Sequence, residues 1–336
     1  MNPLLDVQQL AVSFASYDGE VKAVDNVSFQ VFPGEAVGIV GESGCGKSVT
    51  AHAIMKLIST PPGKYVNGSI LFEDADLLQK PEAEMEKIRG NSISMIFQDP
   101  MTSLNPVLTI GRQIAESLRH HQHMSPSAAY AQSVELLRLV GIPSPEQRLN
   151  SYPHQFSGGM RQRAMIAIAL ACNPKLLIAD EPTTALDVTI QAQILDLMKN
   201  LQSKLNMSII FISHDLSAIA RLCNRVIVMY AGKIAEVGMA EDIFHSSQHP
   251  YTKGLLQSLP RLNVQQKQRL AVIEGQPPDL LHPPAGCPFH PRCPYAMRIC
   301  TEHYPQTTHI TQSHSVKCWL MHPNAPKPEV QTYGTK

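Results

Sequence analysis

The sequence predicts an α/β fold with a phosphate-binding loop after a buried strand, and three observations support this prediction. Residues 41–48 read Gly-Glu-Ser-Gly-Cys-Gly-Lys-Ser, which matches the pattern Gly-x-x-x-x-Gly-Lys-Ser/Thr at every fixed position. The apolar run 36–40 predicts a buried strand before the loop, and residues 48–58 predict a helix after it. The short apolar runs 176–179 and 209–212 are typical of buried parallel strands. Strands that alternate with helices indicate an α/β fold.

The other elements follow in chain order. Apolar and polar residues alternate in short runs over residues 7–40, which predicts an antiparallel β layer, and residues 70–98 add further strands. From residue 110 to about 170 helix formers dominate, with breaks near 141–143 and 152–153. Between the two later apolar runs, an amphipathic helical stripe is formed by Ile190, Ile194, Leu197 and Leu201.

The chain has 336 residues, which suggests one large domain and a smaller one. The composition shifts around residues 250–284, where two Pro-Pro pairs bracket a linker. We therefore expect a large domain at 1–259, with a helical subdomain at about 99–165, and a small C-terminal domain at 260–336.

Composition and charge exclude several functions. The chain is 43% hydrophobic with a formal net charge of zero, so no basic surface argues for nucleic acid or anionic lipid. The uncharged apolar stretch 164–172 is too short to span a bilayer, and the first residues lack the features of a signal peptide. We expect a cytoplasmic chain that would reach a membrane only by docking on other subunits.

The loop at 41–48 predicts a nucleoside triphosphate as ligand. Its glycines let backbone N–H groups turn toward phosphates, and the following helix N-terminus attracts negative charge. Lys47 would reach the β- and γ-phosphates, and the Ser48 hydroxyl would hold Mg²⁺. The residues expected to contact the nucleotide here are Gly41, Ser43, Gly44, Cys45, Gly46, Lys47, Ser48 and Val49.

Two further signals lie downstream. The strand at 176–179 runs into Asp180 and Glu181, where an acidic side chain points toward the ligand crevice of an α/β sheet. Asp180 would hold Mg²⁺ and Glu181 would be the general base toward water. Ser157, Gly158 and Gly159 precede a helix and could form a second anion site, although on local evidence alone an ordinary capped helix explains them better.

These motifs together resemble the ATP-binding subunit of an ABC transporter over about residues 5–250. The matching positions are Gly41–Ser48, Gln98, Ser157–Met160, Asp180-Glu181, Ala185-Leu186-Asp187 and His214. The resemblance implies an ABC-type P-loop ATPase domain with a RecA-like core, an antiparallel β subdomain and a helical subdomain. It implies that Gln98 is the Q-loop glutamine, which senses Mg²⁺ and the γ-phosphate, and that His214 is the switch histidine. Phe14, or alternatively Tyr17, would stack on adenine.

The resemblance also explains why one chain has two anion sites. Two such domains pack head to tail, and each ATP lies between one subunit's phosphate loop and the signature residues Ser157, Gly158 and Gly159 of the other. Asp187 resembles the residue that crosses this dimer interface. Met160 departs from the glutamine of many members, without removing the phosphate contacts expected of the serine and glycines.

The segments 97–106 and 249–256 resemble the oligopeptide/dipeptide (and nickel) importer branch. This implies a subunit at the cytoplasmic face of the membrane that hydrolyses ATP to drive import of di- or oligopeptides. Its implied partners are a second, similar ATPase subunit in a heterodimer, two transmembrane permease subunits docked near 99–165, and an extracellular substrate-binding protein. Import of nickel or another solute, or a non-transport ABC ATPase, are the alternatives.

Four cysteines cluster near the end of the chain, at Cys287, Cys293, Cys300 and Cys318. In a reducing compartment such a cluster indicates a metal site rather than disulfides. No close Cys-x₂₋₄-Cys pair is present, so the spacing favours a [4Fe–4S] cluster over Zn²⁺, with no metal as the third alternative. Residues 286–294 resemble the C-terminal domain of the importer branch, some members of which carry an iron–sulfur cluster.

Overall fold

The structure, a computed structural model, describes residues 2–184, 186–258 and 273–326. A parallel sheet forms its centre, and each of its inner strands is an apolar run because helices or the second sheet cover its faces. In spatial order the parallel strands are β9 (Arg225–Tyr230), β3 (Ala36–Val40), β8 (Ser208–Ser213), β7 (Leu176–Asp180) and β6 (Ile93–Ile96). The three apolar runs predicted as buried strands are confirmed.

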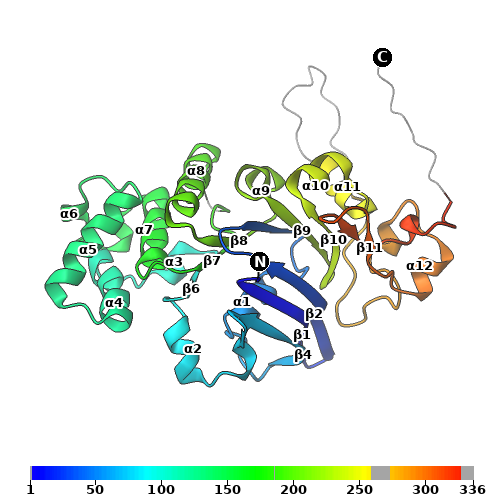
Figure 1. The fold of residues 1–336 in the computed structure, drawn as a ribbon, viewed down its shortest axis with the longest axis horizontal. Coiled ribbons are helices and arrows are strands. Elements are labelled where there is room, and N and C mark those ends of the chain that lie inside the picture. The colour runs from blue at the N-terminus through cyan, green and yellow to red at the C-terminus, as the bar shows by residue number, and fades with distance from the viewer. Residues whose placement is uncertain (1, 185, 259–272, 327–336) are drawn as a thin grey trace, which may run out of the picture.

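The helices that follow these strands pack on the sheet (Figure 1). They are α1 (Lys47–Ile54) after β3, α8 (Val188–Leu205) after β7, and α9 (Leu216–Leu222) after β8. Asp187 caps α8 by accepting from the backbone N–H of Ile190 at 3.0 Å, which fixes where this helix begins. The predicted helix at 48–58 is shorter than expected, because it ends at Ile54.

A second, antiparallel sheet lies beside the core sheet (Figure 1). Its strands are β1 (Leu5–Ser16), β2 (Gly19–Val31), β4 (Gly63–Phe72) and β5 (Ala75–Asp76). The predicted antiparallel layer is confirmed for 7–31, and it leads into the strand 36–40 that was predicted as buried. All five residues of that strand are buried, so it has no alternation and belongs to the parallel sheet.

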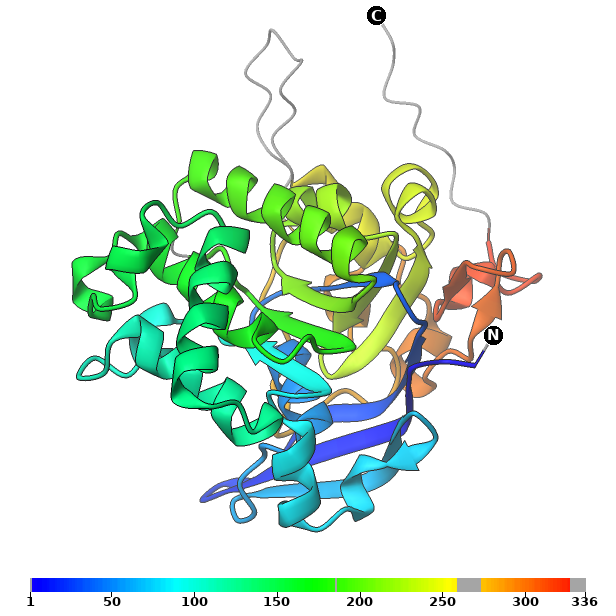
Figure 2. The same ribbon diagram turned by 60° about the vertical axis from the view of Figure 1, so that its left-hand side comes forward.

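A group of helices, here called the helical arm, lies beyond the edge of the core sheet that is formed by β6 (Figure 2). It contains α4 (Ile110–Gln122), α5 (Pro126–Leu139), α6 (Pro145–Arg148) and α7 (Gly158–Leu170), and the short helices α2 (Glu82–Ile88) and α3 (Pro100–Ser103) precede it. Thr109 and Ser125 cap the first two of these helices through their hydroxyls. The helical region predicted between 110 and 170, with its breaks, is confirmed.

The described C-terminal residues continue the core sheet instead of leaving it. After β10 (Lys233–Met239), α10 (Ala240–Ser246) and α11 (Pro250–Gln257), the chain returns through α12 (Arg298–Glu302) to β11 (Thr308–His309) and β12 (Ser315–Val316). Strand β12 pairs with β10. The predicted boundary at 259/260 lies outside the described residues. Within the described ranges, no helix is long and apolar enough to cross a membrane.

Candidate functional site

The phosphate loop joins β3 to α1, and its glycines are required by close backbone contacts. Gly41 has φ 155°, and a Cβ there would lie 2.2 Å from the carbonyl oxygen of Met229. Gly46, which caps α1, has φ 96°, and a Cβ would lie 2.4 Å from the carbonyl oxygen of Ala23. Any larger residue would push the loop away from these strands, so the loop's shape depends on both glycines.

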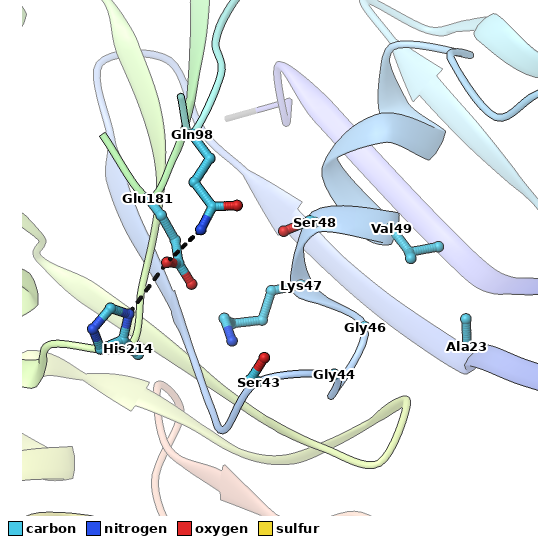
Figure 3. A pocket seen from close by; sticks show the side chains of 10 residues that line it. All are labelled: Ala23, Ser43, Gly44, Gly46, Lys47, Ser48, Val49, Gln98, Glu181 and His214. Carbon is cyan, nitrogen blue, oxygen red and sulfur yellow. Dashed lines mark hydrogen bonds and ion pairs between the residues drawn. The ribbon is translucent and has the colours of Figure 1, made fainter. Parts of the chain in front are cut away.

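The loop faces a cavity of about 520 Å³ whose other wall comes from three different strand ends (Figure 3). Gln98 follows β6, Glu181 follows β7 and His214 follows β8. The lining residues are Ala23, Ser43, Gly44, Gly46, Lys47, Ser48, Val49, Gln98, Glu181 and His214. The carboxyl ends of parallel strands meet at one edge of a sheet, which is why distant motifs converge here.

Lys47 and Ser48 bring polar groups to the floor of this cavity. Lys47 Nζ donates to the carbonyl oxygens of Gly41 at 2.8 Å and Glu42 at 3.0 Å. Ser48 Oγ donates to Asp180 Oδ1 at 3.0 Å, so a hydroxyl and a carboxylate sit side by side as oxygen donors that suit Mg²⁺. Burial raises the pKa of Asp180, and the hydrogen bond from Ser48 opposes that rise.

Glu181 is the centre of the opposite wall. Its Oε2 atom accepts from Gln98 Nε2 at 3.2 Å and Thr184 Oγ1 at 2.9 Å, and lies 3.3 Å from His214 Nδ1. Its φ of 47° is left-handed, a conformation that non-glycine residues rarely adopt outside constrained sites. The side chain is 13% exposed and is therefore held at a fixed position facing the phosphate loop.

The sequence of the chain is similar to those of known proteins. Residues 24–184 match the model of the family described as ABC transporter, and residues 235–300 match the oligopeptide/dipeptide transporter C-terminal region. The chain is 57% identical over 326 residues to the oligopeptide transport ATP-binding protein OppD of Bacillus subtilis (strain 168), covering 97% of this chain and 91% of that protein. The chain belongs to the ABC transporter family.

Two further comparisons agree. The dipeptide transport ATP-binding protein DppD of Bacillus subtilis (strain 168) is 56% identical over 320 residues, covering 95% of each chain. An ATP-binding cassette solved as a dimer in a post-hydrolysis state, bound to ADP and Pi, superposes with a TM-score of 0.64 at 27% identity, covering 70% of this chain and 98% of that one. The predicted ABC ATPase fold is confirmed, and the chain is an ABC-type ATPase.

Some predicted ABC site residues lie outside the cavity lining. Gly41 and Cys45 belong to the loop but face the core: Cys45 is buried, and burial raises the pKa of its thiol. Phe14 is half-buried and packs against the core of the antiparallel sheet, whereas Tyr17 is fully exposed in the β1–β2 turn. Neither aromatic lines the cavity, and the assignment of the adenine-stacking residue stays a prediction.

The predicted ABC signature residues lie apart from this cavity, at the start of α7. Ser157 Oγ accepts from the backbone N–H of Met160 at 3.3 Å, and Gly158 and Gly159 form the first turn of the helix. Neither the serine nor the two glycines line the cavity, as expected if they serve the site of another subunit. Ala185, the first residue of the motif that ends at Asp187, lies outside the described residues.

The four C-terminal cysteines are free thiols in this ABC ATPase. In the described part of the chain, no three His, Cys, Asp or Glu side chains are arranged to hold a metal ion. The predicted metal site is therefore not supported. Burial is the main cause that raises the pKa of Cys287 to about 11 and of Cys318 to about 12.

The sequence analysis missed two residues of the site. Thr184 holds Glu181, and its only signal was a hydroxyl three residues after the acidic pair. Ala23 lines the cavity from β2, where nothing in the sequence distinguishes it from other small strand residues.

Proposed function

We propose that this chain is the ATP-hydrolysing subunit of an importer that carries di- or oligopeptides across the cytoplasmic membrane. The observation that carries the proposal is that one cavity brings the phosphate loop opposite Glu181 and its partners Gln98 and His214. The relatives named oligopeptide and dipeptide transport ATP-binding proteins share more than half of their residues with this chain, which supports peptide as the cargo.

The cavity suits hydrolysis of the γ-phosphate. Lys47 would bind the β- and γ-phosphates, and Ser48 with Asp180 would hold Mg²⁺. Glu181 would accept a hydrogen bond from a water aligned with the γ-phosphorus, while Gln98 and His214 orient the carboxylate. The new bond joins water oxygen to the γ-phosphorus, and the bond to the β–γ bridging oxygen breaks. The products are ADP, inorganic phosphate and a proton.

We propose that the complete site forms between two ATPase subunits. The helix that starts after Ser157 presents the backbone N–H groups of its first turn, which have no partner within the helix and suit phosphate, yet it does not line this chain's own cavity. A related cassette was solved as a dimer bound to ADP and Pi, which supports the same assembly here. We infer that the second subunit is a similar ATPase in a heterodimer, as the resemblance to the oligopeptide branch implies.

We propose that permease subunits dock beside the helical arm, which would place the chain peripherally at the cytoplasmic face. An apolar cavity of about 270 Å³ opens between the end of α1, the segment after β6, and α7. Exposed Phe97 and Met101 lie at or near it, and apolar exposed side chains of this kind are typical of protein interfaces. The importer would also need an extracellular substrate-binding protein to deliver peptide.

The test is purification of the full chain from membranes in mild detergent, with the co-purifying subunits identified by mass spectrometry. We expect two permeases, a second ATPase and a binding protein, and loss of labelled dipeptide or oligopeptide uptake when this chain is deleted. Uptake of nickel instead of peptide would reassign the cargo. Recovery of the chain without any membrane subunit would contradict the transport function.

We also propose that Cys287, Cys293, Cys300 and Cys318 are the ligands of an iron–sulfur cluster. The other three cysteines lie close enough to Cys318 to raise the pKa of its thiol, although burial is the main cause of that rise. Backbone N–H groups two residues further on donate to three of the sulfurs, which favours their thiolate forms.

For this cluster we expect anaerobically purified chain to be brown with broad visible absorbance and iron in stoichiometric amount. Cys293→Ser should remove the colour and the iron, because one ligand is lost. Cys172→Ser is the matched control, since this buried cysteine lies far from the group in sequence and should leave the spectrum unchanged. Colourless wild-type protein with stoichiometric zinc would contradict the cluster.

A further inference from the structure

Arg292 joins the cysteine-containing C-terminal segment to the phosphate loop. It ends the short helix His290–Arg292, directly before Cys293. Its Nη1 donates to Glu42 Oε2 at 2.6 Å and its Nη2 donates to Glu42 Oε1 at 3.0 Å, a fork-to-fork pair across 250 positions of sequence. Glu42 is the second residue of the phosphate loop, so this pair ties the loop to the C-terminal segment.

All three nitrogen atoms of the Arg292 guanidinium donate hydrogen bonds. Nε donates to the carbonyl oxygen of Glu274 at 3.0 Å, Nη2 also donates to that of Ile273 at 3.1 Å, and Nη1 donates to the hydroxyl of Tyr230 at 3.2 Å. With the two bonds to Glu42, each nitrogen of the guanidinium donates in a defined direction. The side chain is only 5% exposed, which makes this pair much more constrained than a surface ion pair.

Glu42 is held as firmly as its partner. Its backbone N–H donates to the hydroxyl of Tyr251 at 2.8 Å, and its carbonyl oxygen accepts from Lys47 Nζ at 3.0 Å. Tyr251 packs in turn on Phe289 of the C-terminal segment, with ring centroids 5.4 Å apart. The backbone of Glu42 is therefore held by Tyr251, and its carboxylate is held by Arg292.

The carboxylate of Glu42 is an unfavourable group beside a site for a polyphosphate. Unpaired, it would repel the phosphates and compete with them for Lys47, which already touches the carbonyl oxygen of the same residue. Paired to Arg292, its charge is balanced and both of its oxygens accept hydrogen bonds from the guanidinium. The arginine thus acts on the ligand through the loop and not by contact with it.

We propose that Arg292 is a positioning residue of the ATP site, which neutralises Glu42 and holds the phosphate loop in the shape that receives Mg·ATP. The proposal rests on the ATPase function and extends the site to a residue of the C-terminal segment. It follows that changes in the segment around Cys293 can reach the phosphate loop through the Arg292 side chain.

The test is Mg·ATP binding by the full chain, measured by titration calorimetry, together with ATPase kinetics of the assembled transporter. Arg292→Ala should raise Kd and KM for ATP by about tenfold, because one partner of a mostly buried charge pair is removed, and should change kcat by less than about threefold. Arg292→Lys keeps the charge but loses the fork, so we expect a smaller rise of about threefold.

Arg298→Ala is the matched control. This arginine lies in the same C-terminal segment and is paired with Glu302, but it is 92% exposed and touches no loop residue. Its removal should leave Kd within about twofold of wild type, as for exposed ion pairs in general. Circular dichroism and the thermal midpoint establish that each variant is folded.

The double variant Glu42→Ala/Arg292→Ala separates positioning from folding. Removing the unpaired carboxylate should recover most of the affinity lost in Arg292→Ala. Wild-type Kd in Arg292→Ala and Arg292→Lys would overturn the proposal, and so would a fall in kcat at unchanged KM. A double variant no tighter than Arg292→Ala would also overturn it. Wild-type chain that binds no Mg·ATP would instead contradict the ATPase function. If Arg292→Ala does not fold, Arg292→Lys and the double variant decide.

Discussion

Glu181→Gln should abolish hydrolysis while ATP binding remains. The amide cannot take a proton from water, so we expect kcat to fall by about 10²–10⁴-fold, the range that general bases contribute. Gln98 and Thr184 can still donate to the remaining oxygen, and the phosphate loop is untouched. Single-turnover ATP hydrolysis and Mg·ATP binding, measured on the same preparation, test both halves of the expectation, and peptide uptake should cease with hydrolysis.

The matched control is Glu241→Gln, an exposed glutamate in α10 that should change neither measurement. Hydrolysis within a few-fold of wild type in Glu181→Gln would show that another group activates water. Loss of both ATP binding and hydrolysis would also contradict the role of Glu181 as general base. It would show that the carboxylate is needed to bind the nucleotide.

The nucleotide site could be predicted in large part because its chemistry is encoded locally. The phosphate loop is a contiguous segment that its residue pattern identifies, although the carbonyl oxygens that require Gly41 and Gly46 belong to Met229 and Ala23 on distant strands. Glu181 was predicted because it follows an apolar strand, at the sheet edge where ligands bind, whereas Gln98 and His214 were predicted from the resemblance to ABC ATPases. The helical arm also follows from local caps and helix formers.

Other features depend on long-range packing, which a single sequence does not encode locally. Strand 36–40 was predicted as buried, but its parallel neighbours β8 and β9 were not, because a fully buried run carries no alternation that tells one partner from another. Phe14 packs against the core of the antiparallel sheet, and its role at the nucleotide stays a prediction. Arg292 pairs with Glu42 across most of the chain, and no local pattern distinguishes it from the other arginines.

Lys47→Ala should remove ATP binding almost completely. The ammonium is the buried positive charge at the floor of the cavity, where it now donates to two loop carbonyls. Hydrogen bonds to charged groups contribute about 1.5–3 kcal/mol each, so losing contacts to two phosphates should raise Kd by about 10²-fold or more. Titration of the full chain with Mg·ATP measures this directly, and hydrolysis should be undetectable at ATP concentrations that saturate wild type.

Lys64→Ala provides the matched control, since Lys64 is an exposed lysine on β4 and its removal should leave Kd unchanged. The two variants at the cavity then give opposite results: Lys47→Ala fails to bind, whereas Glu181→Gln binds and does not hydrolyse. This difference follows from the geometry, because Lys47 belongs to the loop that holds the phosphates and Glu181 belongs to the wall that faces them. Equal loss of binding in both variants would show that the two walls act as one binding unit, and normal binding in Lys47→Ala would remove the phosphate loop from the site.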